Sequence, residues 1–325
     1  MSFSQLPVEL LDAFCFYLSP ADLASLCRTS SVLYPVAQRL LYREVSIDFI
    51  AQNLSVVVTL AKKPRIASYV RKLAIRLSPF STLFSSFYSH LRTALSSMHE
   101  LTSLDLFADA SASWVLRTPE DTTYPRLTHF ASSFAFDEHV VHFLQKAGAL
   151  LDLEVDSLPS LDSRTLPSLS AVSLPRLTDF TGSSQAAQVI VPGRPVDTIH
   201  LNSGDMTEDV AESLAMSTAH VLVLGATTSS RPVPLLGSLA QRMPHLVYLR
   251  MMTTYEFADA PDAVFYENIA NALTSLPDLK AFELSGMHWG SSQKELNDAR
   301  VWQSEPLNTG FGADDAQFAD ASFAY

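Results

Sequence analysis

The chain has 325 residues, of which 47% are hydrophobic, and a formal net charge of −12. A sequence of this length and composition builds a large core, whereas its acidic balance weighs against nucleic acid or an anionic membrane as the main partner, since both attract clustered lysine and arginine. Its two cysteines, Cys15 and Cys27, form no C-x-x-C pair, so they favour a reducing compartment over a disulfide framework or a zinc site.

The first apolar stretch does not have the pattern of a targeting or membrane-spanning segment. No lysine or arginine precedes Arg28, as a secretory signal would require. Pro7 and Pro20 bracket an apolar run that is about half of the ~20 residues needed to cross a bilayer. We therefore expect a protein of the cytoplasm, the nucleus or both, with no membrane partner.

Three short helices are predicted within the first 41 residues. Pro7 suits the first turn of a helix that runs to about Leu18, and Ser19-Pro20-Ala21-Asp22 resembles a capping box that begins a second. Apolar residues at i, i+3 and i+4 over residues 33–41 predict a third, amphipathic helix. Because the first helix is apolar nearly all round, either the rest of this chain or another protein covers its second side.

Residues recur at fixed spacings in Leu6-Pro7-x-Glu9-Leu10-Leu11, Leu18, Asp22-Leu23-x-x-Leu26 and the ending Leu40-Leu41-Tyr42-Arg43-Glu44-Val45. This pattern resembles the F-box, in the fungal, basidiomycete-like form. It implies an F-box over residues 1–46 and, as partner, the Skp-type adaptor of an SCF-type cullin-RING ubiquitin ligase. The adaptor-binding residues that the resemblance implies are Leu6, Pro7, Glu9, Leu10, Leu11, Leu18, Leu23 and Leu26.

The remaining chain contains a ragged repeat of L-x-x-L-x-L, which is typical of leucine-rich-repeat strands. The central apolar positions are 73, 104, 130, 153, 180, 199, 222, 249 and 282, with a mean spacing of about 26 residues. Helical patterns follow over residues 84–98, 137–146, 207–216, 235–243 and 263–276. We predict an α/β fold in which residues 47–289 form an irregular leucine-rich-repeat-like solenoid with parallel strands and outer helices. An irregular α/β domain is the alternative, and residues 157–195 fit the repeat least.

The sequence contains none of the common catalytic or nucleotide-binding motifs, such as G-x-S-x-G, H-E-x-x-H or the Walker motif. His139 and His142 lie three residues apart without the carboxylate or cysteine neighbours of a metal site, so they indicate a solvated or half-buried pair. We expect a non-catalytic protein with no cofactor and no metal.

Side chains that alternate with the inward leucines face the open side of such a solenoid. Such side chains from the middle repeats are acidic. Those from repeats nearer the C-terminus include aromatic and cationic residues, which often anchor interfaces. This pattern favours the docking of a protein substrate with a basic patch, although polar residues that only keep the surface soluble would look the same. The candidate substrate face consists of Asp105, Asp152, Glu154, Asp156, His200, Asn202, Tyr248 and Arg250.

Residues 290–325 are acidic and low in periodicity, which predicts a flexible tail; its aromatic residues would also permit it to fold back on the open face. Taken together, these features favour the substrate-recognition subunit of an SCF-type ubiquitin ligase, acting in ubiquitin conjugation through protein–protein contacts. A non-degradative leucine-rich-repeat scaffold is the alternative, and an enzyme is the third interpretation.

Overall fold

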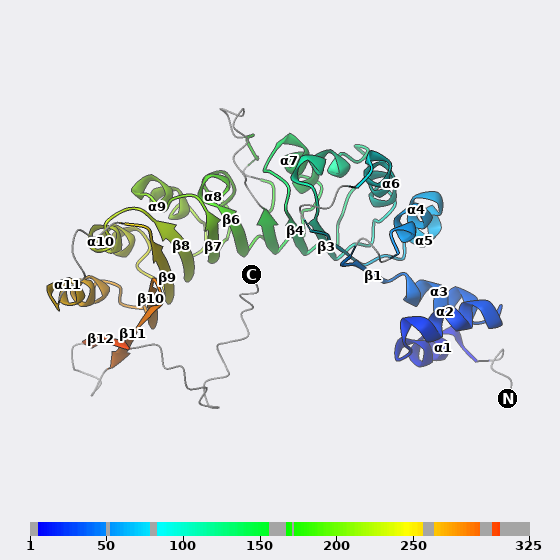
Figure 1. The fold of residues 1–325 in the computed structure, drawn as a ribbon, viewed down its shortest axis with the longest axis horizontal. Helices are drawn as coiled ribbons and strands as arrows, with labels where there is room; N and C mark the ends of the chain where they lie inside the picture. Colours follow the sequence, from blue (N-terminus) through cyan, green and yellow to red (C-terminus); the bar gives the residue numbers. More distant parts are fainter. Residues whose placement is uncertain are drawn as a thin grey trace.

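The computed structural model of this chain describes residues 6–49, 53–78, 83–155, 167–170, 172–255, 263–292 and 301–305. A unit of three helices precedes a long arch of strands and helices (Figure 1). Asp156 of the candidate substrate face and residues 306–325 of the predicted tail lie outside the described residues.

The three-helix unit consists of α1 (Val8–Phe16), α2 (Pro20–Thr29) and α3 (Tyr34–Leu41). The predicted cap of α2 is confirmed, since the Ser19 hydroxyl accepts a hydrogen bond from the Asp22 backbone N–H at 3.2 Å. The unit has its own small core, formed by Leu11, Cys15, Leu23, Val36 and Ala37. This core forms a hydrophobic cluster separate from that of the arch.

A 12-stranded sheet follows, with its strands in sequence order. Strands β1 to β10 pair in parallel, as expected when a helix or loop carries the chain back so that every strand starts at the same end of the sheet. The strands are β1 (Glu44–Ile47), β2 (Lys72–Arg76), β3 (Ser103–Phe107), β4 (His129–Ser132), β5 (Asp152–Val155), β6 (Asp179–Ser183), β7 (Thr198–Ser203), β8 (Val223–Thr228), β9 (Tyr248–Thr253), β10 (Ala281–Leu284), β11 (Met287–Ser292) and β12 (Val301–Glu305).

One buried row of side chains runs across the parallel strands and fixes the register of the repeats. The row is Val45, Leu73, Leu104, Phe130, Leu153, Phe180, Ile199, Leu224, Leu249 and Phe282. It confirms every predicted central position except Leu222, which is wrong by two residues. Leu222 instead precedes β8, where its backbone N–H donates to the Asp197 carbonyl oxygen at 2.8 Å. A shift of two residues keeps a side chain on the same face of a strand, so alternation alone does not distinguish the two registers.

Helices cover the outer side of the arch, and strands line its inner side (Figure 1). The predicted helices are confirmed at α6 (Ser85–Leu95), α7 (Glu138–Leu144), α9 (Glu208–Leu214), α10 (Pro232–Arg242) and α11 (Ala263–Leu273). Four of them are somewhat shorter than predicted, whereas α10 begins three residues before its predicted start. The other described helical segments of the arch are α4 (Ser55–Lys62), α5 (Pro64–Ala67), the 3₁₀ helix η2 (Ala110–Leu116) and α8 (Ser184–Ile190).

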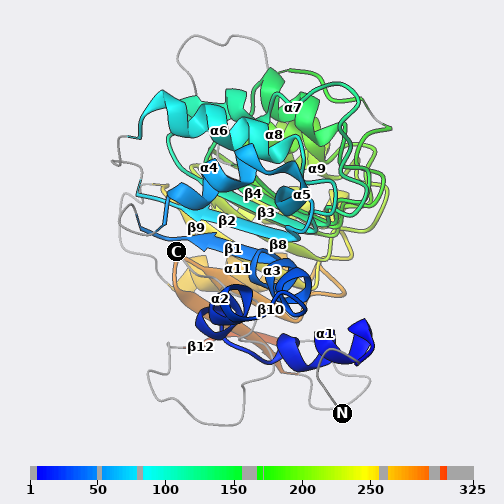
Figure 2. The same ribbon diagram turned by 90° about the vertical axis from the view of Figure 1, so that its right-hand side faces the viewer.

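The protein is therefore an α/β repeat protein of leucine-rich-repeat-like form in which one hydrophobic core lies between the sheet and the outer helices. Figure 2 shows these helices stacked over one side of the sheet. Each repeat buries its apolar side chains against its neighbours, so the array is stable only as a set. The other side of the sheet carries many polar residues, with apolar ones such as Ala74, Ala131 and Val223 between them.

The C-terminal end of the arch departs from the parallel pattern. Strand β10 turns into the antiparallel β11 through Ser285 (φ 45°) and Gly286 (φ 83°), the two left-handed positions of a tight hairpin. Strand β12 pairs with β11, and the buried Trp289 and Trp302 cover the end of the core. Residues 290–292 and 301–305, which lie in the predicted flexible tail, are thus strands.

Candidate protein-interaction surfaces

Helix α1 exposes a row of apolar side chains. Leu10, Phe14 and Tyr17 have 48%, 61% and 86% of their surface exposed. Their i, i+4, i+7 spacing places them on one face, beside the face that packs Leu11 and Cys15 into the core. A contiguous apolar face of this kind marks a protein–protein contact more often than a merely tolerated surface. We call Leu10, Phe14 and Tyr17 the α1 face.

The residues implied by the F-box resemblance fall into two groups. Pro7, Glu9, Leu10 and Leu18 are exposed, and Leu6 and Leu26 are partly buried against the three-helix core. Leu11 and Leu23 are buried in that core, so they hold the helices together and do not offer a surface to an adaptor. Phe14 and Tyr17 were missed, although their spacing from Leu10 along the helix is the signal that identifies them.

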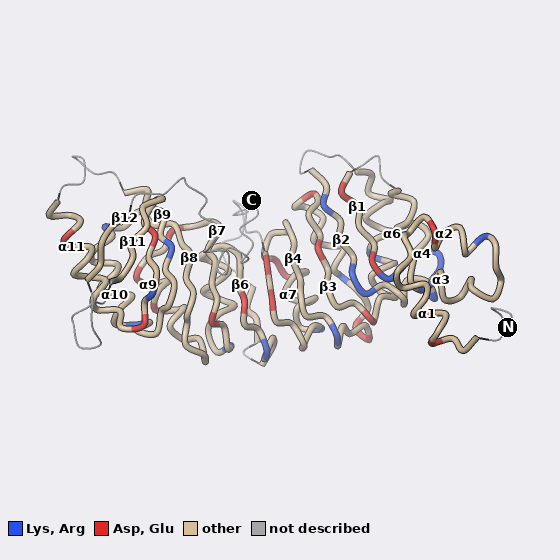
Figure 3. The backbone as a smooth tube through the Cα atoms, turned by 90° about the horizontal axis from the view of Figure 1, so that it is seen from below, with Lys and Arg blue, Asp and Glu red and all other residues tan. Residues whose placement is uncertain are grey.

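The inner face of the sheet presents polar side chains in rows that follow the strand register. His129, Asp152 and Asp179 are directly opposite one another on β4, β5 and β6. Asp105 and Glu154 lie in the adjacent row, with Ala131 between them. Figure 3 shows acidic and basic positions along the strands of this face.

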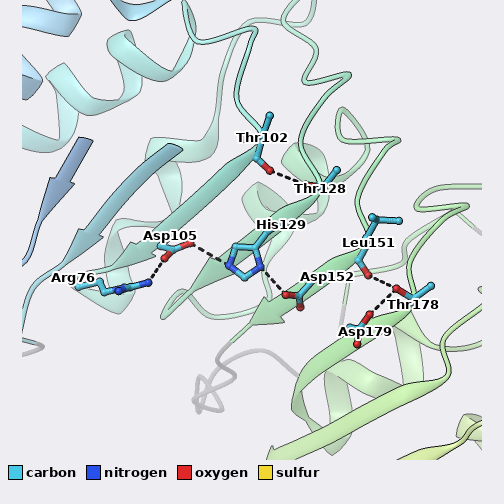
Figure 4. Close-up of polar contacts among 9 residues, drawn as sticks. All are labelled: Arg76, Thr102, Asp105, Thr128, His129, Leu151, Asp152, Thr178 and Asp179. Carbon is cyan, nitrogen blue, oxygen red and sulfur yellow. Dashed lines mark hydrogen bonds and ion pairs between the residues drawn. The ribbon is translucent and has the colours of Figure 1, made fainter. Parts of the chain in front are cut away.

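A chain of ion pairs joins four neighbouring strands, β2 to β5 (Figure 4). The Arg76 guanidinium donates to Asp105 at 2.5 Å. The His129 ring lies between two carboxylates, with its Nε2 3.2 Å from Asp105 and its Nδ1 2.6 Å from Asp152. His129 was missed because the sequence pattern identified only its neighbour Phe130, which is buried.

The carboxylates make His129 a cation. Hydrogen bonds to Asp105 and Asp152 raise the pKa of His129 to about 10, against the opposing effect of burial. Burial by itself would raise the pKa of Asp105, but bonds from His129 and Arg76 outweigh it and lower that pKa. The Asp105 side chain is only 8% exposed and is held by both cations, so it orders the face; its contact with a substrate stays a prediction.

Asp152 and Asp179 form the negative centre of the face. Burial raises the pKa of Asp179, and the charges of Asp152 and Asp197 raise it further, although the Thr178 hydroxyl donates to Asp179 at 2.6 Å. Like charges that lie directly opposite on neighbouring strands repel each other. A cation placed against Asp152 and Asp179 relieves that repulsion.

The remaining candidate substrate residues gather further along the arch. Arg250 Nε lies 3.4 Å from a Glu283 carboxylate oxygen, and the Tyr248 hydroxyl donates to Glu283 at 3.5 Å. Burial lowers the pKa of His200, and the charge of Arg250 adds to that effect. Gly225 separates His200 from Arg250, and a Cβ there would come within 2.9 Å of the His200 ring. Asn202 is exposed at the end of β7.

Replacing His129 with glutamine is expected to have a pH-dependent effect on stability. The pKa of His129 is raised from 6.5 to about 10 on folding, so its contribution is complete below pH 6.5 and is lost as the pH rises through about 10. The difference in unfolding free energy between wild type and variant should therefore shrink as the pH rises from 6.5 to about 10. Urea denaturation across this range measures it.

A matched background tests the cause of that dependence. In an Asp152→Asn background the His129 ring loses one of its two carboxylate partners, so the pH dependence of the His129→Gln effect should weaken. A dependence that is the same in both backgrounds would contradict the assigned ion pair.

Two features of the described residues bear on other classes of function. Groups of three or more histidine, cysteine, aspartate or glutamate side chains placed to hold a metal ion do not occur among them. In the same part of the chain, every helix is too short or too polar to span a membrane.

Comparison with known proteins adds little to this description. No protein-family model and no curated protein matches the chain. A chain in the crystal structure of the Rad7 and Elc1 complex from yeast is 13% identical, with a TM-score of 0.30, over 78% of this chain and 91% of that one. Similarity at this level supports no conclusion about fold or function.

Proposed function

We propose that this chain is the substrate-recognition subunit of an SCF-type ubiquitin ligase, with no catalytic activity of its own. In this proposal the three-helix unit is an F-box that docks a Skp-type adaptor, and the inner face of the arch holds a protein substrate. Bringing the substrate close to a ubiquitin-charged enzyme then accelerates transfer by proximity.

The observation that carries the proposal is the α1 face. Three large apolar side chains in one row remain exposed, within a unit whose sequence resembles the F-box. Burying side chains of this size against a partner contributes about 1.5–3 kcal/mol each. A second polypeptide is the occupant that the resemblance implies.

The proposal is tested with Leu10→Asp/Phe14→Asp in the full chain, mixed with a recombinant Skp-type adaptor. Both positions are exposed, so the variant is expected to fold as the wild type does. Loss of two interface anchors should weaken the complex about a hundredfold or more in isothermal titration. Val264→Asp/Met216→Asp, at exposed apolar positions on the arch, is the matched control and should bind normally.

The outcomes separate the interpretations. A wild-type chain that ignores the adaptor, or a double variant that binds it as tightly, rules out the F-box assignment. Adaptor binding without ubiquitination of any protein held on the arch would favour the non-degradative scaffold.

For the substrate, we propose a protein segment that places a lysine or arginine against Asp152 and Asp179. Asp152→Asn/Asp179→Asn should weaken the binding of a fluorescent lysine-rich peptide about tenfold, because charge-assisted hydrogen bonds are lost. The control Glu208→Gln/Glu267→Gln removes the same charge from exposed helix positions on the outer side. Equal losses in both variants would mean that only net charge attracts the peptide.

A further inference from the structure

The positive charge of this acidic chain is concentrated where the three-helix unit joins the arch. Residues 39–76 contain eight lysine or arginine residues and two acidic ones, so they carry +6 while the rest of the chain carries −18. Blue positions gather around α3, α4 and β2 in Figure 3. A separation of charge this large favours an anionic partner at the junction and not elsewhere.

A groove of about 520 Å³ lies at this junction. Helices α1 and α3 contribute to it from one side, and the segment that leads into β2 contributes from the other. Its charged lining residues are Asp12, Arg39, Arg43, Arg71 and Glu100. The volume is large enough to take several side chains of a bound peptide.

Both carboxylates of the groove are already engaged. Asp12 forms an ion pair with Arg39, and Glu100 forms one with Arg126, which does not line the groove. The ion pairs within the described part of the chain involve neither Arg43 nor Arg71. Two guanidinium groups of the groove are therefore available to an anion.

The backbone holds these two arginines side by side. The Arg43 carbonyl oxygen accepts a hydrogen bond from the Arg71 N–H at 2.8 Å, just before β1 and β2 begin to pair. Like charges at neighbouring strand positions repel each other, so the arrangement costs stability when nothing lies between them. An anion that bridges them removes that cost.

An apolar surface borders the two cations. Phe16 is 61% exposed, and the Arg43 guanidinium lies 5.8 Å from the centre of its ring. Leu40 and Ala13 complete this part of the lining. The groove thus matches a ligand that presents an anionic group and an apolar side chain next to each other.

We propose that this groove binds an acidic segment of a partner protein, in which aspartate or glutamate carboxylates bridge Arg43 and Arg71. A neighbouring apolar side chain of that segment packs on Phe16. Arginine matches a carboxylate in two parallel hydrogen bonds, so two adjacent arginines select closely spaced carboxylates. Nucleic acid needs a longer positive track, whereas Asp12 and Glu100 border this one. The groove borders the α1 face, since the Phe16 and Tyr17 rings lie 5.4 Å apart. Its two arginines lie outside the α1 face, so the proposal does not depend on the adaptor assignment.

The test measures the binding of the full chain to a fluorescent peptide of alternating glutamate and phenylalanine by fluorescence anisotropy. Arg43→Gln/Arg71→Gln is expected to weaken binding about tenfold or more. Arg71→Lys should have a smaller effect, because lysine keeps the positive charge but cannot form the two parallel hydrogen bonds of a guanidinium group. Lys62→Gln/Lys63→Gln is the matched control, since it removes two charges from the same basic segment outside the groove, and it should bind normally.

Several outcomes would overturn the proposal. They are no binding by the wild type, equal losses in the two double variants, and equal binding of a peptide in which glutamine replaces glutamate. Stronger competition by inorganic phosphate or by an oligonucleotide than by the unlabelled acidic peptide would assign the groove to another anion. The thermal unfolding midpoint of Arg43→Gln/Arg71→Gln should stay close to that of the wild type, because the change removes a repulsion together with the contact of Arg43 on Phe16. A folded variant with intact binding also rejects the site.

Discussion

Replacing Leu224 with alanine is expected to lower the free energy of unfolding by about 3–5 kcal/mol, as deletion of a fully buried leucine does where the cavity cannot collapse. Leu224 is completely buried and lies between Ile199 and Leu249 in the central apolar row. Strands on both sides hold the sheet in place, so neighbouring groups cannot move far into the space. Urea denaturation followed by circular dichroism measures the loss.

Leu222→Ala is the matched control and separates the two registers. Leu222 is 39% exposed and precedes β8, so its truncation should change the unfolding free energy by no more than about 0.5 kcal/mol. A repeat with Leu222 at its centre would predict a larger loss of unfolding free energy from Leu222→Ala than from Leu224→Ala. A larger loss from Leu222→Ala than from Leu224→Ala would therefore reject the observed register.

Replacing Arg194 with methionine should have an effect of similar size. Arg194 is only 1% exposed, and its guanidinium donates to five backbone carbonyl oxygens, those of Ser170, Ser173, Val189, Ile190 and Pro192. It thereby ties the end of α8 to the loop before β6. Methionine fills the space but leaves these acceptors without a donor. We expect the free energy of unfolding to fall by about 3–5 kcal/mol, and not by more, because water can reach part of the loop and replace some of the lost hydrogen bonds.

Two further variants isolate the cause. Burial lowers the pKa of Arg194, so the site tolerates its charge only because the carbonyls surround it. Arg194→Lys offers a single ammonium group that cannot reach every acceptor and should lose an intermediate amount. Arg176→Met, at an exposed arginine of the same region, should be nearly neutral. Equal effects at Arg176 and Arg194 would mean that the carbonyl bonds contribute nothing.

Burial and ion pairing distinguish the residues that form an interaction surface from those that only stabilise it. On α1, neighbouring leucines have different roles, since Leu10 faces outward and Leu11 packs inside the core. On the inner face, Asp105 is held by Arg76 and His129, whereas Asp152 and Asp179 keep a negative centre. Charge and hydropathy do not distinguish the two leucines from each other, or the three aspartates.

The parts of this protein that depend on local rules could be predicted from the sequence. The cap at Ser19, the recurring strands and five of the outer helices were predictable, because capping, alternation and helical spacing act over a few residues. The α1 face was predictable in kind, since a helix that is apolar all round cannot bury every side within a small unit.

Contacts between distant segments were needed to establish the register of β8, the chain of ion pairs through His129 and the pairing of Arg43 with Arg71. The clamp that joins Arg194 to Ser170 and Ser173 also belongs to this group. The physical reason is that these features join residues about 20 to 30 positions apart, and each is fixed by hydrogen bonds between neighbouring repeats or strands. A pattern within one repeat predicts the face of the sheet on which a side chain lies. The residues that it contacts there belong to adjacent strands, so they depend on how the repeats pair.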